Sequence, residues 1–354
     1  MKQAFLIIIF LSLFVAGCKK DAKPVAVAPQ APALDSSDVR TSATGEKITD
    51  VQLRYLPNLG TEYIYELTTS GRDSAIMKAD TNITNVVESK MIYKMKVVPV
   101  ETKKDSSTVY SVTFLNFVVD ASSDNEKVSY RSGMSLDEKQ KSMFLQYEAA
   151  LNNTYTALIS STGELVKVSN TEKILAKVLE LAKAPKNLKP EQKESIKRQI
   201  DVTLIYPTVQ QLFRKLSKAK VSDNSNWTLD MDLPVNRILT FKTKQILTLK
   251  GLEKFGETKV ARIDVTSQST PDIAPEAKQN AINVEHASLD GTGKVLFDMN
   301  EKMLSYSKTS LMVLTAIKGE TQGPKGKMTV QSRNRSEKVN TLKLLETRTK
   351  SSSK

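Results

Sequence analysis

Cys18, the only cysteine of the chain, is the residue whose type and position most directly suggest chemistry. It follows an uncharged run of 13 residues, Ala4 to Ala16, and Lys2 precedes that run. The run is too short to cross a membrane as a helix, because about 20 apolar residues are needed. Its length and its basic start are typical of a secretory signal peptide. With no second cysteine, the chain cannot form an intramolecular disulfide bond.

The residues Val15, Ala16, Gly17 and Cys18 resemble the lipobox of bacterial lipoprotein signals. The resemblance implies that diacylglycerol alkylates the Cys18 thiol, that residues 1–17 are removed as a signal peptide, and that the new amino group receives a palmitate-type acyl chain. Several chains anchor a protein stably, since each buried CH2 contributes about 0.8 kcal/mol. The alternative is an incidental cysteine in a cleaved leader or an uncleaved anchor.

Residues 18–50 are expected to be the lipidated cysteine and a tether. Prolines at positions 24, 29 and 32 stand among alanines, serines and charges, with no apolar period that would support a core. Lys19 directly follows the cysteine, and by resemblance to lipoprotein sorting signals this favours the outer membrane over the inner one. Whether the folded part faces the periplasm or the cell surface stays open. Residues 51–350 are then expected to form the folded envelope domain.

Other reactive side chains are few and scattered. His286 is the only histidine, so no multi-histidine metal site can form, and a polar strand position explains it better than a general base. Serine hydrolase signatures are missing. The segment from Gly291 to Lys294 superficially resembles a phosphate-binding loop but lacks its spacing, so it is expected to be a turn or bulge. Trp227, the only tryptophan, is expected to anchor the core or an interface; it is also the candidate for contact with a ligand or partner. No cofactor or metal is expected.

The elements that would carry these residues are mostly strands. Apolar residues alternate with polar ones from Val51 to Tyr55, and a turn at Asn58 to Gly60 precedes a second alternating run from Tyr63 to Leu67. The same pattern runs from Met91 to Val97, and the segment 154–169 indicates a hairpin with Gly163 in its turn. Further strands are expected at 109–118, 238–250, 259–266, 294–298, 304–317, 328–331 and 339–345, with a loop between Pro271 and Pro275. The period-two pattern predicts an α+β fold with a mostly antiparallel sheet, curved or similar to a half-barrel.

Between residues 170 and 219 the apolar period changes to that of helices. Ser169 and Glu172 are spaced as a capping box, and Pro190 and Pro207 stand where second and third helices could begin. The sequence therefore predicts an insert of three short helices that covers the sheet.

The net charge of +13 is concentrated in two regions. Residues 171–220 and residues 318–354 each carry +7, so the remainder is close to neutral. Solvated helix faces and a terminal tail explain such runs, and attraction to an anionic lipid or glycan surface is the alternative. Nucleic acid is not an expected partner, because aromatic residues are sparse in the basic stretches and no binding motif is found.

Several stretches together resemble an uncharacterised lipoprotein family of the Bacteroidota, a domain of unknown function. They are LRYLPNLGTEYIYELTT from Leu53, the hairpin around Gly163 and Val166, the residue Trp227, and GTGKVLFDMNEKMLSYS from Gly291. The chain departs from the family pattern in two turns, at 224–226 and at Asn300. The resemblance would cover about residues 50–318, and it implies an architecture and an envelope location but no activity.

Three functions are compatible with the sequence. The first is a non-enzymatic envelope lipoprotein that binds another envelope component, such as a protein, a lipid or an anionic glycan, or assists assembly. The second is a carrier of lipids or lipoproteins with an apolar hollow. The third is an envelope hydrolase that uses two carboxylates. The concave side of the sheet distinguishes the three functions. It would be filled in the first, apolar and hollow in the second, and polar and open in the third.

Overall fold

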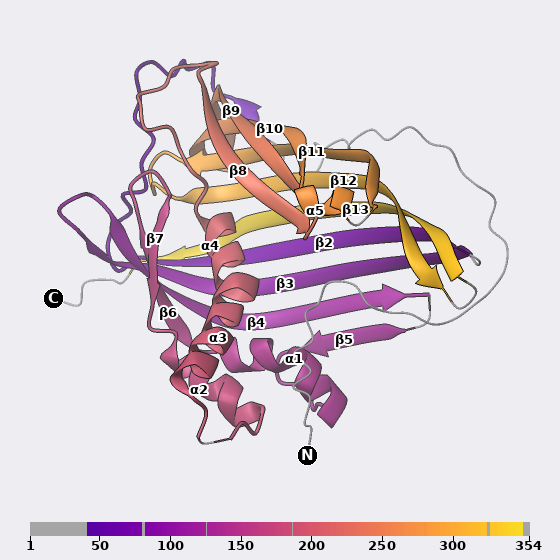
Figure 1. Ribbon diagram of the computed structural model, residues 1–354. Coiled ribbons are helices and arrows are strands. Elements are labelled where there is room, and N and C mark those ends of the chain that lie inside the picture. The colour runs from indigo at the N-terminus through magenta and orange to yellow at the C-terminus, as the bar shows by residue number, and fades with distance from the viewer. Residues whose placement is uncertain are drawn as a thin grey trace.

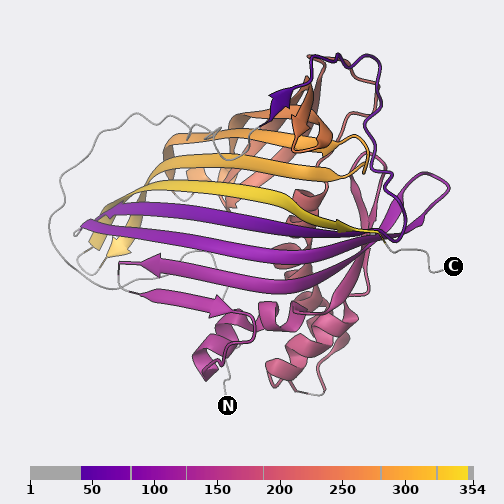
Figure 2. The same ribbon diagram turned by 180° about the vertical axis from the view of Figure 1, so that it is seen from behind.

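A computed structural model describes residues 41–79, 82–124, 126–185, 187–279, 281–323 and 326–349. Within these ranges 13 strands form one antiparallel sheet in the order β1-β9-β10-β11-β12-β13-β2-β3-β4-β6-β7, with β5 paired to β4 and β8 paired to β9. The sheet is open and strongly curved, and the helices lie against its concave side (Figure 1 and Figure 2). The predicted α+β fold, a curved antiparallel sheet with a helical insert, is confirmed.

The strands of the first half are β1 (Ser42–Ala43), β2 (Glu62–Lys78), β3 (Asn82–Thr102), β4 (Thr108–Ser123), β5 (Lys127–Arg131), β6 (Thr154–Ile159) and β7 (Leu165–Ser169). Those of the second half are β8 (Asn226–Asn236), β9 (Leu239–Phe255), β10 (Thr258–Ile273), β11 (Asn283–Asp298), β12 (Leu304–Gly323) and β13 (Gly326–Arg348). The predicted hairpin around Gly163 is confirmed as β6 and β7.

Strand β13 joins the two halves, because it pairs with both β12 and β2. The expectation of two short strands, 328–331 and 339–345, followed by a basic tail is therefore wrong. Residues 326–348 form one continuous strand instead. Backbone hydrogen bonds do not depend on side-chain polarity, so a polar, basic segment can form a central strand if both neighbours are present.

The expected strand from Val51 to Tyr55 is also absent. Val51 forms one isolated bridge with Val221, and residues 52–58 have no regular structure. Leu53 and Tyr55 are nevertheless buried, because they pack into the core as an extended segment. The folded part starts earlier than expected: β1 pairs with β9, and Ile48 is buried, so the end of the segment expected as a tether lies on the fold.

Two further predictions, a turn or bulge at Gly291 to Lys294 and a loop between Pro271 and Pro275, are wrong. Gly291 to Lys294 is not a turn but the middle of β11, paired with β10 on one side and β12 on the other. A Cβ atom on Gly293 would lie 2.9 Å from Thr309 Cγ2, so the glycine permits close packing between these strands. Pro271 lies within β10, and the short helix α5 (Pro275–Gln279) follows it in place of a loop.

The helical insert begins with α2 (Glu172–Leu181), but the predicted capping box is wrong. The N-cap residue is Thr171, which makes no side-chain cap bond, and Ser169 is the last residue of β7. Pro190 starts α3 (Pro190–Ile200), as predicted. The third helix is not separate, because a π-helical turn, η2 (Asp201–Ile205), connects α3 directly to α4 (Tyr206–Leu212).

One helix had no clear signal in the sequence. Helix α1 (Glu138–Ala150) follows β5 and begins with a capping box between Asp137 and Gln140. Its apolar residues are too few for a strong helical period. Phe144 and the final alanines of α1 are buried against the sheet, so tertiary packing stabilises a helix of weak amphipathic character.

The main core lies between these helices and one end of the concave face. Tyr65 and Leu67 of β2 face the same side as Tyr93 of β3, as predicted from their spacing. Aromatic rings dominate this core: Phe114 lies 4.9 Å from Phe117 between ring centroids. The helices thus fill one end of the concave side, whereas the strands extend beyond them.

Candidate functional site

The residues predicted to carry the lipid anchor, Cys18 and its neighbours Val15 to Gly17, lie outside the described residues. Their role stays a prediction. No helix among the described residues is both long and apolar enough to cross a bilayer. In the same ranges, no three His, Cys, Asp or Glu side chains come together in a group able to hold a metal ion.

Trp227 lies on β8 with its side chain half-buried against the main core. Its indole Nε1 donates a hydrogen bond to the backbone oxygen of Lys215, at 3.3 Å. The tryptophan therefore anchors the segment that follows α4, which agrees with the expected anchoring role. His286 is exposed on β11, at a polar strand position.

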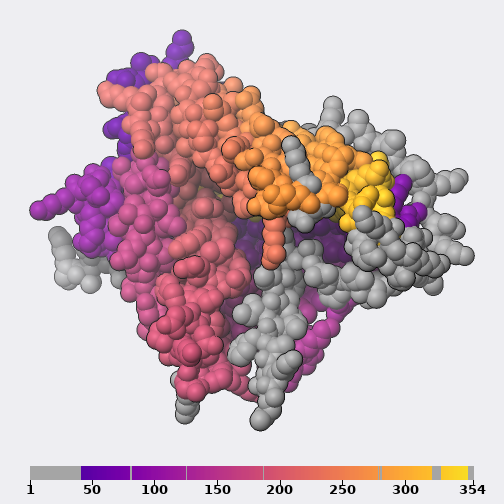
Figure 3. Space-filling model, viewed as in Figure 1, coloured from indigo at the N-terminus to yellow at the C-terminus, as the bar shows by residue number. Residues whose placement is uncertain are grey.

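Beyond the helices the concave face is partly apolar and uncovered by any described helix except the short α5. Leu239 and Phe241 of β9 and Leu289 of β11 form a second, smaller core cluster. Half-buried side chains pack around it, and they are Leu233, Val235, Ala287, Leu311 and Val313. We call these eight residues the apolar strip. Figure 3 shows that the surface is hollowed between the helices and the rim formed by β8, with atoms of the early strands visible at depth.

Small side chains cross the sheet beside this strip. Strand register places ten residues in one concave row from β8 to β5, and five of them are glycine, serine or alanine. The row consists of Leu229, Gln245, Ser267, Gly291, Leu311, Lys338, Gly71, Ser89, Ala121 and Val128. A pocket of about 550 Å³ lies at its β2–β5 end, where Gly71, Ser89, Ala121 and Val128 contribute to the lining. The missing side-chain volume explains the hollow there.

Arg214 stands at the boundary between the filled and the open parts of the concave face. Its Nη2 atom donates to Thr309 Oγ1 of β12 at 3.3 Å, and also to Gln211 Oε1. Its Nε atom is buried and has no hydrogen-bond acceptor. Among the described residues no carboxylate forms an ion pair with Arg214. Burial lowers the pKa of the guanidinium to about 10, so it stays positively charged at neutral pH.

A second pocket, of about 350 Å³, lies at the turn between β11 and β12 and is lined by several acids. Asp298 Oδ1 accepts the backbone N–H groups of Asn300 and Glu301, at 2.8 and 3.0 Å. Tyr63 donates its hydroxyl to Glu301 Oε2 at 2.9 Å. Burial, and then the hydrogen bond to Glu301, raise the pKa of that tyrosine. These bonds hold the turn in place and engage Asp298 and Glu301, two of the acids that line the pocket.

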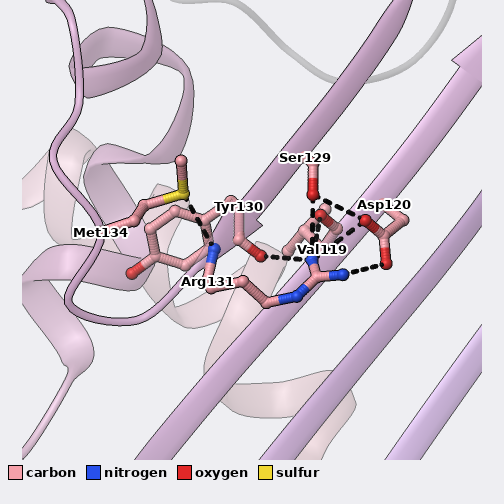
Figure 4. Close-up of polar contacts among 6 residues, drawn as sticks. All are labelled: Val119, Asp120, Ser129, Tyr130, Arg131 and Met134. Atoms are coloured by element: carbon pink, nitrogen blue, oxygen red, sulfur yellow. Dashed lines mark hydrogen bonds and ion pairs between the residues drawn. The ribbon is translucent and has the colours of Figure 1, made fainter.

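The convex face carries a bidentate ion pair that fastens the edge strand β5 to β4 (Figure 4). Arg131 Nη1 and Nη2 each lie 2.9 Å from an oxygen of Asp120, and Ser129 donates to the same carboxylate at 2.8 Å. The hydrogen bonds from Arg131 and then from Ser129 lower the pKa of Asp120. This pair is structural, although Asp120 and Ser129 also belong to the lining of the pocket of about 550 Å³.

We expect Asp120→Asn to weaken folding only slightly at pH 7, by less than about 1 kcal/mol, because the pair is exposed to water. A carboxyl group with a lowered folded-state pKa stabilises the fold above its unfolded-state pKa and loses that contribution as the pH falls through its folded-state value. The difference between the variant and the native chain should therefore become smaller as the pH falls from 7 to 3. Urea denaturation at pH 7 and pH 3 measures it. Asp290→Asn, at an exposed carboxylate without an ion pair among the described residues, is the control and should leave the stability at pH 7 unchanged. A difference that persists unchanged at pH 3 would contradict the assignment.

The sequence of the chain was compared with protein-family profiles and curated proteins, and its fold with solved structures. The profile of a family described as "Family of unknown function (DUF6263)" matches residues 105–303. No curated protein matches the chain significantly. The match covers β4 to β11, including the whole helical insert, and lies within the 50–318 range expected from the sequence.

Solved structures give only distant likenesses. A lipovitellin structure, entitled "Lipid-protein interactions in lipovitellin", aligns with 84% of this chain at 8% identity and a TM-score of 0.41, and the chain covers 26% of it. The outer membrane protein OprG of Pseudomonas aeruginosa aligns with 81% of the chain at 8% identity and a TM-score of 0.18, with 97% of OprG covered. The chain thus spans about a quarter of the lipovitellin chain. All these scores are below 0.5, so no function is taken from these structures.

Proposed function

We propose that this chain, which belongs to the DUF6263 family of unknown function, is a lipid-anchored protein of the bacterial envelope that binds an acyl-chain ligand on its concave face without catalysing a reaction. The uncovered apolar strip beside the row of small residues is the observation that carries the proposal. The central residues of this strip are buried and five others are half-buried, and half-buried apolar side chains that gather in one concave region are typical of ligand-binding surfaces.

The anchor part of the proposal rests on the sequence alone. The signal-like run up to Ala16 and the lipobox-like residues before Cys18 support attachment to a membrane, and Lys19 favours the outer one. A folded domain that is held near a bilayer would be close to acyl-chain lipids that it could bind. The Bacteroidota origin suggested by the sequence resemblance stays a prediction.

A carrier and a non-enzymatic binding protein differ in what happens after binding, and the concave face is the same in both. The hydrolase alternative has less support, because Asp298 and Glu301 are engaged in holding the β11–β12 turn. We therefore propose binding without catalysis, and the identity of the ligand is the first property to determine.

Mass spectrometry of lipid extracted from the purified chain without residues 1–18 tests the proposal. We expect reproducible co-purified acyl lipid. Leu311→Gln replaces a half-buried side chain of the apolar strip by a polar one of similar size, so lipid occupancy should fall about tenfold, as expected for the loss of one buried apolar contact surface. Val166→Gln, at an exposed position of β7, is the matched control and should leave occupancy unchanged. Absence of lipid from the native chain would exclude the proposal.

A further inference from the structure

Arg214 is held rigidly, and its position is set by three elements that meet behind it. Its backbone N–H donates to the hydroxyl of Tyr55 at 3.0 Å, and the same hydroxyl donates to its backbone oxygen at 3.1 Å. Leu216 N donates to Thr162 O at 2.8 Å, and Trp227 binds Lys215 O. These bonds fix the backbone from Arg214 to Leu216, and the bonds from Nη2 to Gln211 and Thr309 orient the guanidinium itself.

The charge of this guanidinium is not neutralised within the described part of the protein. Its hydrogen-bond partners there are uncharged oxygens, and one donor, Nε, has none. Partial burial of a cation without a carboxylate costs free energy, since the lost hydration is not replaced by an opposite charge. Such a cost is tolerated where the charge serves a ligand, because a guanidinium binds a carboxylate through short, charge-assisted hydrogen bonds.

The surroundings of this guanidinium change abruptly from polar to apolar. Thr309, its partner on β12, is followed on the same face by Leu311 and Val313 of the apolar strip, and Ile317 continues that face. From Leu311 to Ile317 the strand extends about 20 Å at ~3.3 Å per residue. One acyl chain spans about 15 Å, half of a bilayer core of about 30 Å. This face of β12, which also carries Thr315 between Val313 and Ile317, is therefore long enough for a single extended chain.

We infer that the concave face binds a long-chain carboxylate, a single-chain fatty acid, with its carboxylate on Arg214 and its chain along the apolar strip. This inference rests on the proposed binding of acyl chains and specifies the head group. One unpaired guanidinium matches one negative charge, which favours a carboxylate over a phosphate monoester that carries more than one. Lys338, paired in register with Leu311, is exposed to solvent, so Arg214 is the partly buried cation at this border.

Photolabelling of the full chain in isolated membrane vesicles tests the inference. The probes are a photoactivatable palmitic acid and the corresponding alcohol, each with a terminal alkyne for detection, and peptide mapping locates the label. The acid should label the segment from 283 to 317 about tenfold more than the alcohol, the factor that corresponds to one charge-assisted hydrogen bond. Arg214→Gln should remove this preference, and Arg214→Lys should restore part of it.

Lys215→Gln is the matched control, because Lys215 is exposed and pairs with Glu164 at 3.0 Å on the surface. It should leave the preference unchanged, and equal thermal stability of the variants excludes unfolding as a cause. Equal labelling by acid and alcohol, unaffected by Arg214→Gln, would overturn the head-group assignment while acyl binding stands. Absence of label from both probes in this segment would overturn the proposed function as well.

Discussion

Gly163→Ala should destabilise the protein by about 3 kcal/mol or more, from backbone strain together with overpacking. Gly163 has a φ of +86°, which a residue with a Cβ atom adopts only with strain. A Cβ atom there would lie 2.4 Å from the backbone oxygen of Arg214 and 2.7 Å from Tyr55 Cε2. Neither neighbour can move away at low energetic cost, because the Arg214 oxygen belongs to the main chain and the Tyr55 ring is fully buried. The measurement is the midpoint of urea denaturation.

Gly133→Ala separates the two contributions. Gly133 has nearly the same φ, +85°, but nothing lies within 4 Å of the added Cβ atom. Only the conformational cost remains, about 1–2 kcal/mol. If both variants lost the same stability, the close approach of the β6–β7 turn to Arg214 would not be a real constraint. A larger loss for Gly163→Ala supports the clamped position on which fatty-acid binding depends.

Cys18→Ser should release the protein from the membrane fraction. A hydroxyl group does not substitute for the thiol in lipid attachment, so the variant would lack all acyl chains. The loss is large, because each CH2 withdrawn from the bilayer costs about 0.8 kcal/mol and even one chain holds a protein only marginally. Intact mass and sedimentation with vesicles measure the result: the native protein should carry the mass of the lipid, and the variant should not.

Ser12→Ala is the control for this experiment, since it changes the apolar run and keeps the thiol. It should be processed and anchored as the native chain is. An unchanged mass and unchanged sedimentation of the Cys18→Ser variant would refute lipid attachment, whereas the described fold and its concave face would be unaffected. The anchor and the ligand site are therefore tested independently.

The two tests also separate two sources of lipid. Covalent acyl chains at Cys18 stay with the protein after organic extraction, whereas a fatty acid on the concave face is extracted. Lipid recovered from the chain without residues 1–18 consequently belongs to the binding site alone.

The types of most elements could be predicted from residue patterns within each segment. Alternation of apolar residues identified the strands around Tyr65 and Tyr93, and the change of period identified the insert that begins near α2. These signals are local, because a strand or a helix buries one face whatever its neighbours are. The position of Cys18 after the apolar run is a local signal as well. Segments without a strong period, such as α1 and β13, were either not predicted or predicted wrongly.

The tertiary structure alone decided which part of the concave side is filled. The period of β12 shows that Thr309 and Leu311 share a face. It does not show that Arg214 contacts Thr309 and that no described helix covers Leu311. Register across ten strands aligned the small residues from Ser267 to Ala121, and those positions are far apart in the chain. Local periodicity fixes the face of each residue, whereas its neighbours depend on pairing between distant segments. The candidate site is made of such neighbours, so only the folded chain could reveal it.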